Sequence, residues 1–280
     1  MRPSDVLLTP WTPVLPVRLF VRGPDRQDGV GNMALDDAVL DWVRAQNAPV
    51  MAVRTYTWSQ PTWSVGAHQP QRDASQLRND ERGLPVVVRP TGGRAILHDG
   101  DCSFAVATNL PGLLQLPLSD SYRLLMAMVQ TALARCGADT RLSKQQNTSE
   151  YVRSAACFAT HTPSDLLDSQ GRKLVGSAQV RRRGGLLQHG AMLSPHRRYD
   201  DPGFVASFHQ ALVDAITTTL QKRHGGNALQ LGPLSDNALA ADWRRKQRAY
   251  SQSAQDWMTD SGRADKASTT SGSHLLPASL

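Results

Sequence analysis

The stretch VVVRPTGGRAILHDGDCSFAV, residues 86–106, holds the densest group of chemically useful side chains in the sequence. Its β-branched start predicts a strand over residues 86–89. The Pro-Thr-Gly-Gly run that follows predicts a turn, because proline fixes φ and glycine permits positive φ and a close approach of backbone to a ligand. Arg89 and His98 add hydrogen-bond donors on either side of this turn. The turn is therefore predicted to be either the rim of a binding site or a tight hairpin end with solvated arginines.

Strand and helix patterns flank this stretch on both sides. Alternating or β-branched runs predict further strands over residues 17–22, 50–58, 62–65, 103–108, 173–183 and 186–193, with 50–58 paired to 62–65 and the last two joined by a Gly184-Gly185 turn. Apolar residues at helical spacing predict helices over residues 32–44, capped by Asn32, over 119–136, over 202–220 and, more weakly, over 238–250. Strands with a few long helices on one side indicate an α+β domain built on a mixed sheet.

The domain organisation follows from length and composition. We expect one catalytic domain over residues 17–225, within the range common for α/β domains. Residues 1–16, with three prolines, predict an irregular arm. Residues 226–255 predict a polar helical extension, and residues 256–280, rich in Ser, Thr, Gly and Asp, a disordered tail. No apolar run reaches the ~18 residues of a membrane helix, and the N-terminus lacks the apolar core of a secretory signal, so we expect a soluble, cytoplasmic protein. We also expect a monomer.

The charge balance leaves the type of partner open. The chain carries 31 basic and 24 acidic residues, a formal net charge of +7. Such a charge can attract nucleic acid, anionic lipid or an acidic protein. Aromatic residues make up only 6% and the basic residues are scattered, which argues against a nucleic-acid binder. Neither a GxGxxG nor a GxxxxGK[ST] motif is present to support a nucleotide site.

The three cysteines, Cys102, Cys136 and Cys157, have no CxxC spacing, so a disulfide framework or zinc site is not expected. Cys136 belongs to the apolar stripe of its helix and is predicted to be part of the core. Cys102 is flanked by Asp99 and Asp101, and carboxylates raise the pKa of a thiol, so Cys102 is predicted to be structural.

Cys157 has the most favourable surroundings for a nucleophile. Arg153 and His161 each lie four residues away, and Lys173 begins the next strand-like segment. Cationic neighbours stabilise the thiolate, which is the form that attacks a thioester. A buried core thiol is an equally good interpretation from the residues alone. Lys173 lies in an apolar strand, where a lysine is costly unless its ammonium faces a pocket.

Two further basic features allow two interpretations each. His189, in LLQHGAML, is predicted to be a hydrogen-bonded core residue or, alternatively, part of a site. The run Arg181, Arg182 and Arg183 is predicted to be an exposed hairpin end or a docking point for an acidic partner.

Three motifs in colinear order resemble the biotin/lipoate protein ligase superfamily. They are NMALDDAVL at residues 32–40, RPTGGRAILHDGDCSFAV at 89–106, and ACFATHTPSDLLDSQGRKLVGSAQVRRRGGLLQHGAML at 156–193. Within that superfamily the sequence is most similar to the cysteine-dependent octanoyltransferases of lipoate biosynthesis.

The resemblance implies a mixed-sheet catalytic domain that moves an octanoyl group from acyl carrier protein to a lysine of a lipoyl domain. The acceptor in such pathways is the glycine cleavage H protein or an acyltransferase subunit of a 2-oxoacid dehydrogenase. No cofactor, metal, nucleic acid or membrane is implied. By the same resemblance Cys157 carries the acyl thioester, and Lys173 lowers the pKa of that cysteine and orients the acyl carbonyl. The implied substrate-binding residues are Arg89, Gly92, Gly93, His98, Gly176 and Ser177.

The main alternative is an ATP-dependent lipoate ligase of the same fold. Such ligases generally lack the cysteine, and many carry an accessory domain for which the residues after Gly225 leave little room. A non-catalytic carrier-protein or nucleic-acid binding module is the second alternative. One departure bears on substrate choice: THTPSDLLDSQ follows Cys157 where the transferases usually have an aromatic residue and a glutamate. The donor or acceptor could therefore differ, including transfer between two lipoyl proteins.

Overall fold

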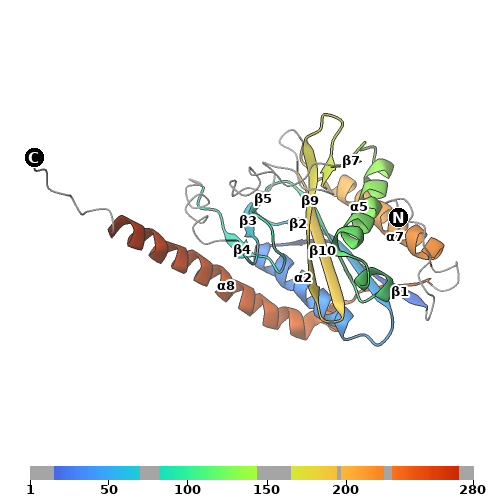
Figure 1. Cartoon of the computed structure of the whole chain (residues 1–280), viewed down its shortest axis with the longest axis horizontal. Helices are drawn as coiled ribbons and strands as arrows, with labels where there is room; N and C mark the ends of the chain where they lie inside the picture. The colour runs from blue at the N-terminus through green and yellow to red at the C-terminus, as the bar shows by residue number, and fades with distance from the viewer. Residues whose placement is uncertain (1–15, 70–81, 144–164, 194–196, 224–228, 271–280) are drawn as a thin grey trace, which may run out of the picture.

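The computed structural model describes residues 16–69, 82–143, 165–193, 197–223 and 229–270. These residues form a large mixed sheet with helices on both faces and a small sheet beside it (Figure 1). Among the helices of the described residues, none is long and apolar enough to cross a membrane.

The large sheet has eight strands in the order β11-β1-β2-β6-β10-β9-β8-β7. These are β1 (Val17–Gln27), β2 (Val50–Trp58), β6 (Cys102–Thr108), β7 (Arg141–Leu142), β8 (Leu166–Leu167), β9 (Lys173–Arg182), β10 (Gly185–Met192) and β11 (Leu229–Pro233). Strand β1 is parallel to both β2 and β11, and the other neighbours are antiparallel. The predicted mixed sheet is thereby confirmed. Because β11 pairs with β1, the sheet includes chain beyond residue 225, where the catalytic domain was expected to end.

The small sheet contains β3 (Thr62–Val65), β4 (Val86–Val88) and β5 (Ile96–His98), with β3 in the middle. The bounds predicted for β2 and β3 are confirmed, but the expected pairing between these two strands is wrong, because they belong to different sheets. Three residues, Ser59, Gln60 and Pro61, connect them, and Ser59 N–H donates to Gln27 O at the end of β1.

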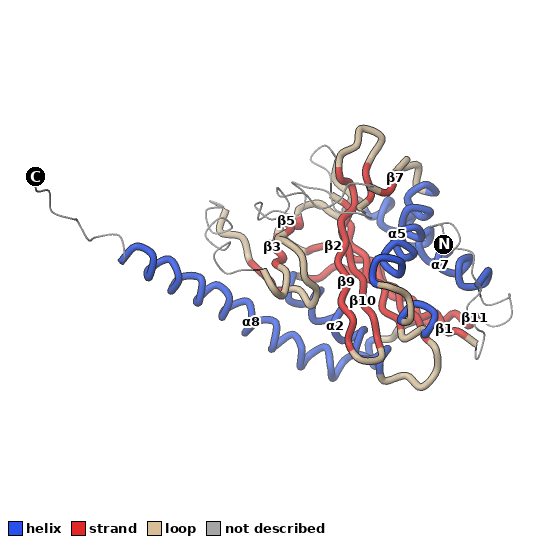
Figure 2. The backbone as a smooth tube through the Cα atoms, in the orientation of Figure 1, coloured by secondary structure: helices blue, strands red, loops and turns tan. Residues whose placement is uncertain are grey.

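Helices cover both faces of the large sheet, so the expectation of helices on one side is wrong (Figure 2). The helices are α2 (Gly29–Arg44), α4 (Pro111–Leu114), α5 (Leu118–Arg135), α7 (Pro202–Arg223) and α8 (Asp236–Thr270). Met51 and Val53 of β2 join the core formed with α5 and α7, whereas Val50 and Ala52 join the core formed with α2. Successive strand residues point to opposite faces, and all nine residues of β2 are buried, so both faces need a cover.

Helix α2 begins before the position that the sequence indicated. Asp28, not Asn32, is its N-cap, and the Asp28 Oδ1 atom accepts a hydrogen bond from Gly31 N–H at 2.7 Å. Asn32 lies one turn inside the helix and is buried. Its amide donates to Gln27 O and Thr57 O, so Asn32 ties the helix to the two neighbouring strands.

The hairpin of β9 and β10 turns at Arg183 and Gly184, one residue earlier than predicted. Gly184 has φ +78°, a backbone conformation that favours glycine, and Gly185 already pairs with Arg182. The arginines of this hairpin are not a simple exposed end. Arg181 donates to Leu116 O and to Ser121 Oγ, and Arg182 forms an ion pair with Asp37.

Helix α8 lies along α2 and passes under the small sheet, and its far end projects beyond the body of the molecule (Figure 1). The boundary expected at residue 256 therefore falls inside a helix. Lys246 is buried, with its Nζ 2.6 Å from Asp37 Oδ2 and 2.6 Å from Asp41 Oδ2 on α2. Trp257 is buried against Val65 and Ala95. Sequence pattern did not show this contact because the partners of α8 are distant in the chain.

Candidate active site

A cavity of about 510 Å³ lies between the small sheet, the β9–β10 hairpin and the first turn of α5. All seven described residues that the sequence assigned to the site line it: Lys173, Arg89, Gly92, Gly93, His98, Gly176 and Ser177. The eighth, Cys157, lies outside the described residues, as do Arg153 and His161. Apolar side chains such as Met33, Trp58 and Ile96 also line the cavity.

Residues 89–93, here called the RPTGG turn, form one wall of the cavity. Arg89 is 4% exposed, and its guanidinium donates to Ser64 O at 3.0 Å, Gly92 O at 2.9 Å and Arg94 O at 2.7 Å. Gly93 has φ +95°, and a Cβ on Gly66 would lie 2.0 Å from Gly93 O. Arg89 thus shapes the turn by binding its carbonyl groups, and the close approach of two backbones explains the glycines.

His98 extends from β5 into the wall beside this turn. Its ring stacks on Trp58 with centroids 3.7 Å apart. Its Nδ1 lies 3.0 Å from Asp101 Oδ2, and its Nε2 lies 2.8 Å from Ser64 Oγ. The donors expected near the turn are therefore present, but the imidazole nitrogens are engaged within the protein.

Lys173 enters the cavity from β9 together with a carboxylate. Its Nζ lies 2.9 Å from Asp165 Oδ2, and each of these side chains is 1% exposed. A buried ammonium is tolerated when it is paired and hydrogen-bonded. The sequence reasoning missed Asp165, although the DLLD segment precedes the strand of Lys173 and forms the adjacent strand β8.

The first turn of α5 supplies residues of the cavity that the sequence reasoning also missed. Tyr122 O–H donates to Ser177 O at 2.5 Å, and Ser177 Oγ–H donates to Tyr122 OH at 2.6 Å. Gln188 Nε2–H donates to Ser177 Oγ at 3.1 Å. The periodicity predicted this helix, but no local signal places its start against β9.

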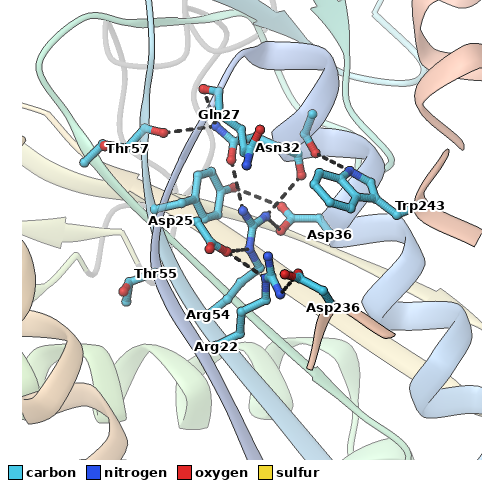
Figure 3. Close-up of polar contacts among 12 residues, drawn as sticks. Arg22, Asp25, Gln27, Asn32, Asp36, Arg54, Thr55, Thr57, Asp236 and Trp243 are labelled. Atoms are coloured by element: carbon cyan, nitrogen blue, oxygen red, sulfur yellow. Dashed lines mark hydrogen bonds and ion pairs between the residues drawn. The ribbon is translucent and has the colours of Figure 1, made fainter. Parts of the chain in front are cut away.

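Asp36 of α2 and Arg54 of β2 form a buried ion pair (Figure 3), and two residues that contact Asp36, Tyr56 and His189, line the cavity. Arg54 Nη1 is 2.6 Å from Asp36 Oδ1, and Arg54 Nη2 donates to Asn32 Oδ1 at 3.0 Å. Tyr56 O–H donates to Asp36 Oδ2 at 2.9 Å, and His189 Nδ1 lies 2.8 Å from the same oxygen. Both interpretations of His189 therefore hold: it is a buried, hydrogen-bonded residue and it also lines the cavity.

The electrostatics of this pair fix its charge state. Burial raises the pKa of the Asp36 carboxyl, but Arg54 and His189 lower it more, so the pKa lies below its usual value. Burial, and then the charge of Asp36, raise the pKa of Tyr56 well above its usual value. Asp36 is thus an anion that accepts from a neutral phenol.

The two described thiols are poor nucleophiles. Cys102 is fully buried, and burial followed by the Asp101 charge raises its pKa well above the usual value, which confirms the structural role predicted for it. Cys136 packs against the core at the end of α5, as predicted, and burial raises its pKa. Among the residues that the structure describes, no group of three or more His, Cys, Asp or Glu side chains could hold a metal ion.

Replacing Asp36 by Asn should destabilise the protein by about 3–5 kcal/mol, because Arg54 would keep a buried charge without its counter-ion. Since the folded pKa of Asp36 lies below the usual value of 3.8, its contribution is complete above that pH and is lost as the pH falls through the folded pKa. Urea unfolding of the unchanged protein and of Asp36→Asn, at several pH values from 7 to 3, measures the difference in their free energies of unfolding.

The matched control is Asp214→Asn, since Asp214 forms an exposed pair with Arg135 at 3.7 Å. Its cost should stay below about 1 kcal/mol. Equal costs for the two substitutions would contradict the importance of the buried pair.

Comparison with known proteins supplies the family. Residues 28–217 match the model of the lipoyl protein ligase A/B catalytic domain. Curated relatives include the octanoyltransferase LipM of Halalkalibacterium halodurans, 32% identical over 62% of this chain and 64% of the relative. Those of Anoxybacillus flavithermus and Kyrpidia tusciae are 33% and 35% identical, over 74% and 75% of this chain and 75% and 77% of the relatives. The match spans less than two thirds of the length of several LipM relatives, 60% and 61% in two of them.

Solved structures show the same fold at lower identity. A Thermoplasma acidophilum protein with bound lipoic acid superimposes with a TM-score of 0.62 at 20% identity, covering 87% of this chain and all of the other. Lipoate-protein ligase A bound with ATP gives 0.60 at 17% identity, covering 84% of this chain and 95% of the other. Since the family model covers most of its length, the chain belongs to the lipoyl protein ligase A/B catalytic domain family.

Proposed function

We propose that this protein is an octanoyltransferase of protein lipoylation that uses Cys157 as its acyl carrier. The observation that carries the proposal is the similarity to LipM octanoyltransferases, 33–35% identical over about three quarters of the chain. The cavity supports it, because Lys173, the RPTGG turn and the Gly176–Ser177 segment all line one space with apolar walls.

The proposed reaction has two acyl transfers. The Cys157 thiolate attacks the carbonyl carbon of an octanoyl thioester, the bond to the donor sulfur breaks, and the donor leaves as a thiolate, which takes up the proton that Cys157 lost on ionisation. The amine of the acceptor lysine then attacks the Cys157 thioester, loses a proton as the amide forms, and releases the Cys157 thiolate. The first step exchanges one thioester for another and the second is downhill, so neither needs ATP.

Lys173 is proposed to serve both steps. Its ammonium, held by Asp165, faces the cavity and can donate a hydrogen bond to the acyl carbonyl oxygen as negative charge develops there.

The proposed partners are octanoyl-acyl carrier protein as donor and a lipoyl-domain protein as acceptor. The acceptor would be glycine cleavage H protein or a 2-oxoacid dehydrogenase acyltransferase subunit, and the enzyme would act as a monomer in the cytoplasm without a cofactor. Carrier and lipoyl domains are generally acidic, so the net charge of +7 would raise the rate of encounter.

An ATP-dependent lipoate ligase is the second candidate, because one of the similar folds is lipoate-protein ligase A bound with ATP. At 17% identity that likeness concerns the fold alone. The two candidates differ in whether acyl transfer needs a nucleotide.

Incubation with octanoyl-acyl carrier protein should add one octanoyl mass to the peptide that contains Cys157, because a thioester forms there. Hydroxylamine should remove it. Peptide mass spectrometry measures the adduct. Cys157→Ala should abolish labelling, whereas the matched variant Cys136→Ala should label normally. Stable labelling at another residue would contradict the proposed nucleophile.

Lys173→Ala should move the alkylation of Cys157 to higher pH by roughly one to two units, because a nearby cation stabilises the thiolate. The rate of reaction with iodoacetamide between pH 5 and 10 measures this shift. Lys222→Ala removes an exposed lysine at the end of α7 and serves as the control. An unchanged profile in Lys173→Ala would remove the tuning role of Lys173.

A further inference from the structure

The RPTGG turn is reached by two chains of hydrogen bonds that each run from an aspartate through a histidine to a hydroxyl group. The first begins at Asp36 of α2. His189 of β10 lies 2.8 Å from Asp36 Oδ2 through Nδ1 and 2.7 Å from Thr91 Oγ1 through Nε2. Asp36 and Thr91 are 0% exposed and His189 is 5% exposed, so water does not compete for these bonds.

The second chain begins at Asp101 on the other side of the turn. His98 lies 3.0 Å from Asp101 Oδ2 through Nδ1 and 2.8 Å from Ser64 Oγ through Nε2. Arg89 Nη1 in turn donates to Ser64 Oγ at 3.3 Å and to Ser64 O at 3.0 Å. This chain therefore ends on the first residue of the turn, and the Asp36 chain ends on the third.

The arrangement is the same in both chains. A carboxylate can only accept, so Nδ1–H of each imidazole donates to its aspartate. Nε2 forms the bond to the hydroxyl of Thr91 or Ser64, and a hydroxyl can take either side of that bond because it both donates and accepts. Both nitrogens of each histidine are consequently occupied, although both rings line the cavity.

We propose that the two chains clamp the RPTGG turn and that His189 and His98 are positioning residues for acyl transfer. This inference rests on the proposed function. Neither histidine has a nitrogen left for a reacting atom, so acid–base catalysis by them is not part of the proposal. The chains instead fix the two glycines of the turn, Gly92 and Gly93, at the cavity wall.

The bond between Thr91 and His189 matters most, because it joins the turn to the large sheet. Lys173 lies in the same sheet, on β9, and β9 pairs with β10, the strand that carries His189. Backbone bonds from Ala67 N to Thr91 O and from Arg89 N to Val65 O hold the turn only to the end of β3. The Thr91 hydroxyl is therefore a direct link between the turn and the sheet that carries Lys173, beside the longer link through Ser64, His98 and Asp101.

Three variants test the clamp. Thr91→Val removes the hydroxyl with little change in shape, Thr91→Ser keeps it, and Thr140→Val is the control. Thr140 is also a buried threonine, but its Oγ1 has no hydrogen-bond partner among the described residues. In Thr91→Val the kcat of Cys157 acylation should fall roughly 10- to 100-fold with a much smaller change in KM, since misplacement of reacting groups affects mainly the chemical step. Thr91→Ser and Thr140→Val should stay within about threefold of the unchanged protein.

A fourth variant tests the route of the coupling. In His189→Asn the amide can still donate to Asp36 from the position of Nδ1, but it cannot reach Thr91. Its effect on kcat should resemble that of Thr91→Val, and the double variant should be no slower than the slower single one. Independent, multiplying effects would overturn the chain from Asp36 to Thr91.

Amide hydrogen exchange gives a readout that needs no acyl transfer. A peptide spanning residues 86–98 should exchange faster in Thr91→Val than in Thr91→Ser or Thr140→Val, because the turn loses an anchor. If the unchanged protein shows no acylation but this pattern of exchange appears, the proposed function fails and the clamp stands. If Thr91→Val matches the unchanged protein in exchange, or in kcat where acylation occurs, the clamp is overturned.

Discussion

The structure depends on the buried ion pair between Asp36 and Arg54. Removing two charges from water costs several kcal/mol each, and their attraction offsets this only when the remaining polar atoms are also bonded. Here Asn32, Tyr56 and His189 supply those bonds. The pair joins α2 to β2 and, through His189, to β10. It therefore fixes three elements of the fold next to the cavity.

From this pair the arrangement continues to the site. His189 bonds to both Asp36 and Thr91, and Thr91 is the third residue of the RPTGG turn. Helix α8 supports the same region from outside, since Lys246 pairs with α2 and Trp257 packs on the small sheet. The small sheet is thus held by a polar contact on its inner side and an apolar contact on its outer side. A site between two sheets needs such cross-links, because few backbone hydrogen bonds join the sheets.

The sequence predicted the elements whose signals are local. Strands β2 and β3 have the predicted bounds, and α5 and α7 lie within a few residues of the predicted helices, because apolar periodicity is read within one element. Strands β5, β7, β8 and β11 were missed because runs of two to five residues carry little pattern. Asn32 was mistaken for the cap of α2 since Asn and Asp are both good caps, and Arg54, its buried partner, lies in another element.

In the site, too, the sequence predicted what local motifs carry and missed the contacts between distant elements. The motifs predicted which residues gather, and the seven described ones do line one cavity. They could not indicate that Arg89 and His98 bond within the protein, that Asp165 and Tyr122 complete the walls, or that Thr91 bonds to His189, because those contacts depend on three-dimensional packing. The role of Cys157 stays a prediction from the resemblance.

If a thioester alone drives acylation of the lipoyl domain, the reaction does not need ATP. The direct measurement is the amount of octanoyl amide formed on a lipoyl-domain lysine from octanoyl-acyl carrier protein, with and without ATP and Mg²⁺. We expect equal rates under both conditions. A strict requirement for ATP would contradict transfer from the thioester alone and identify the protein as a ligase.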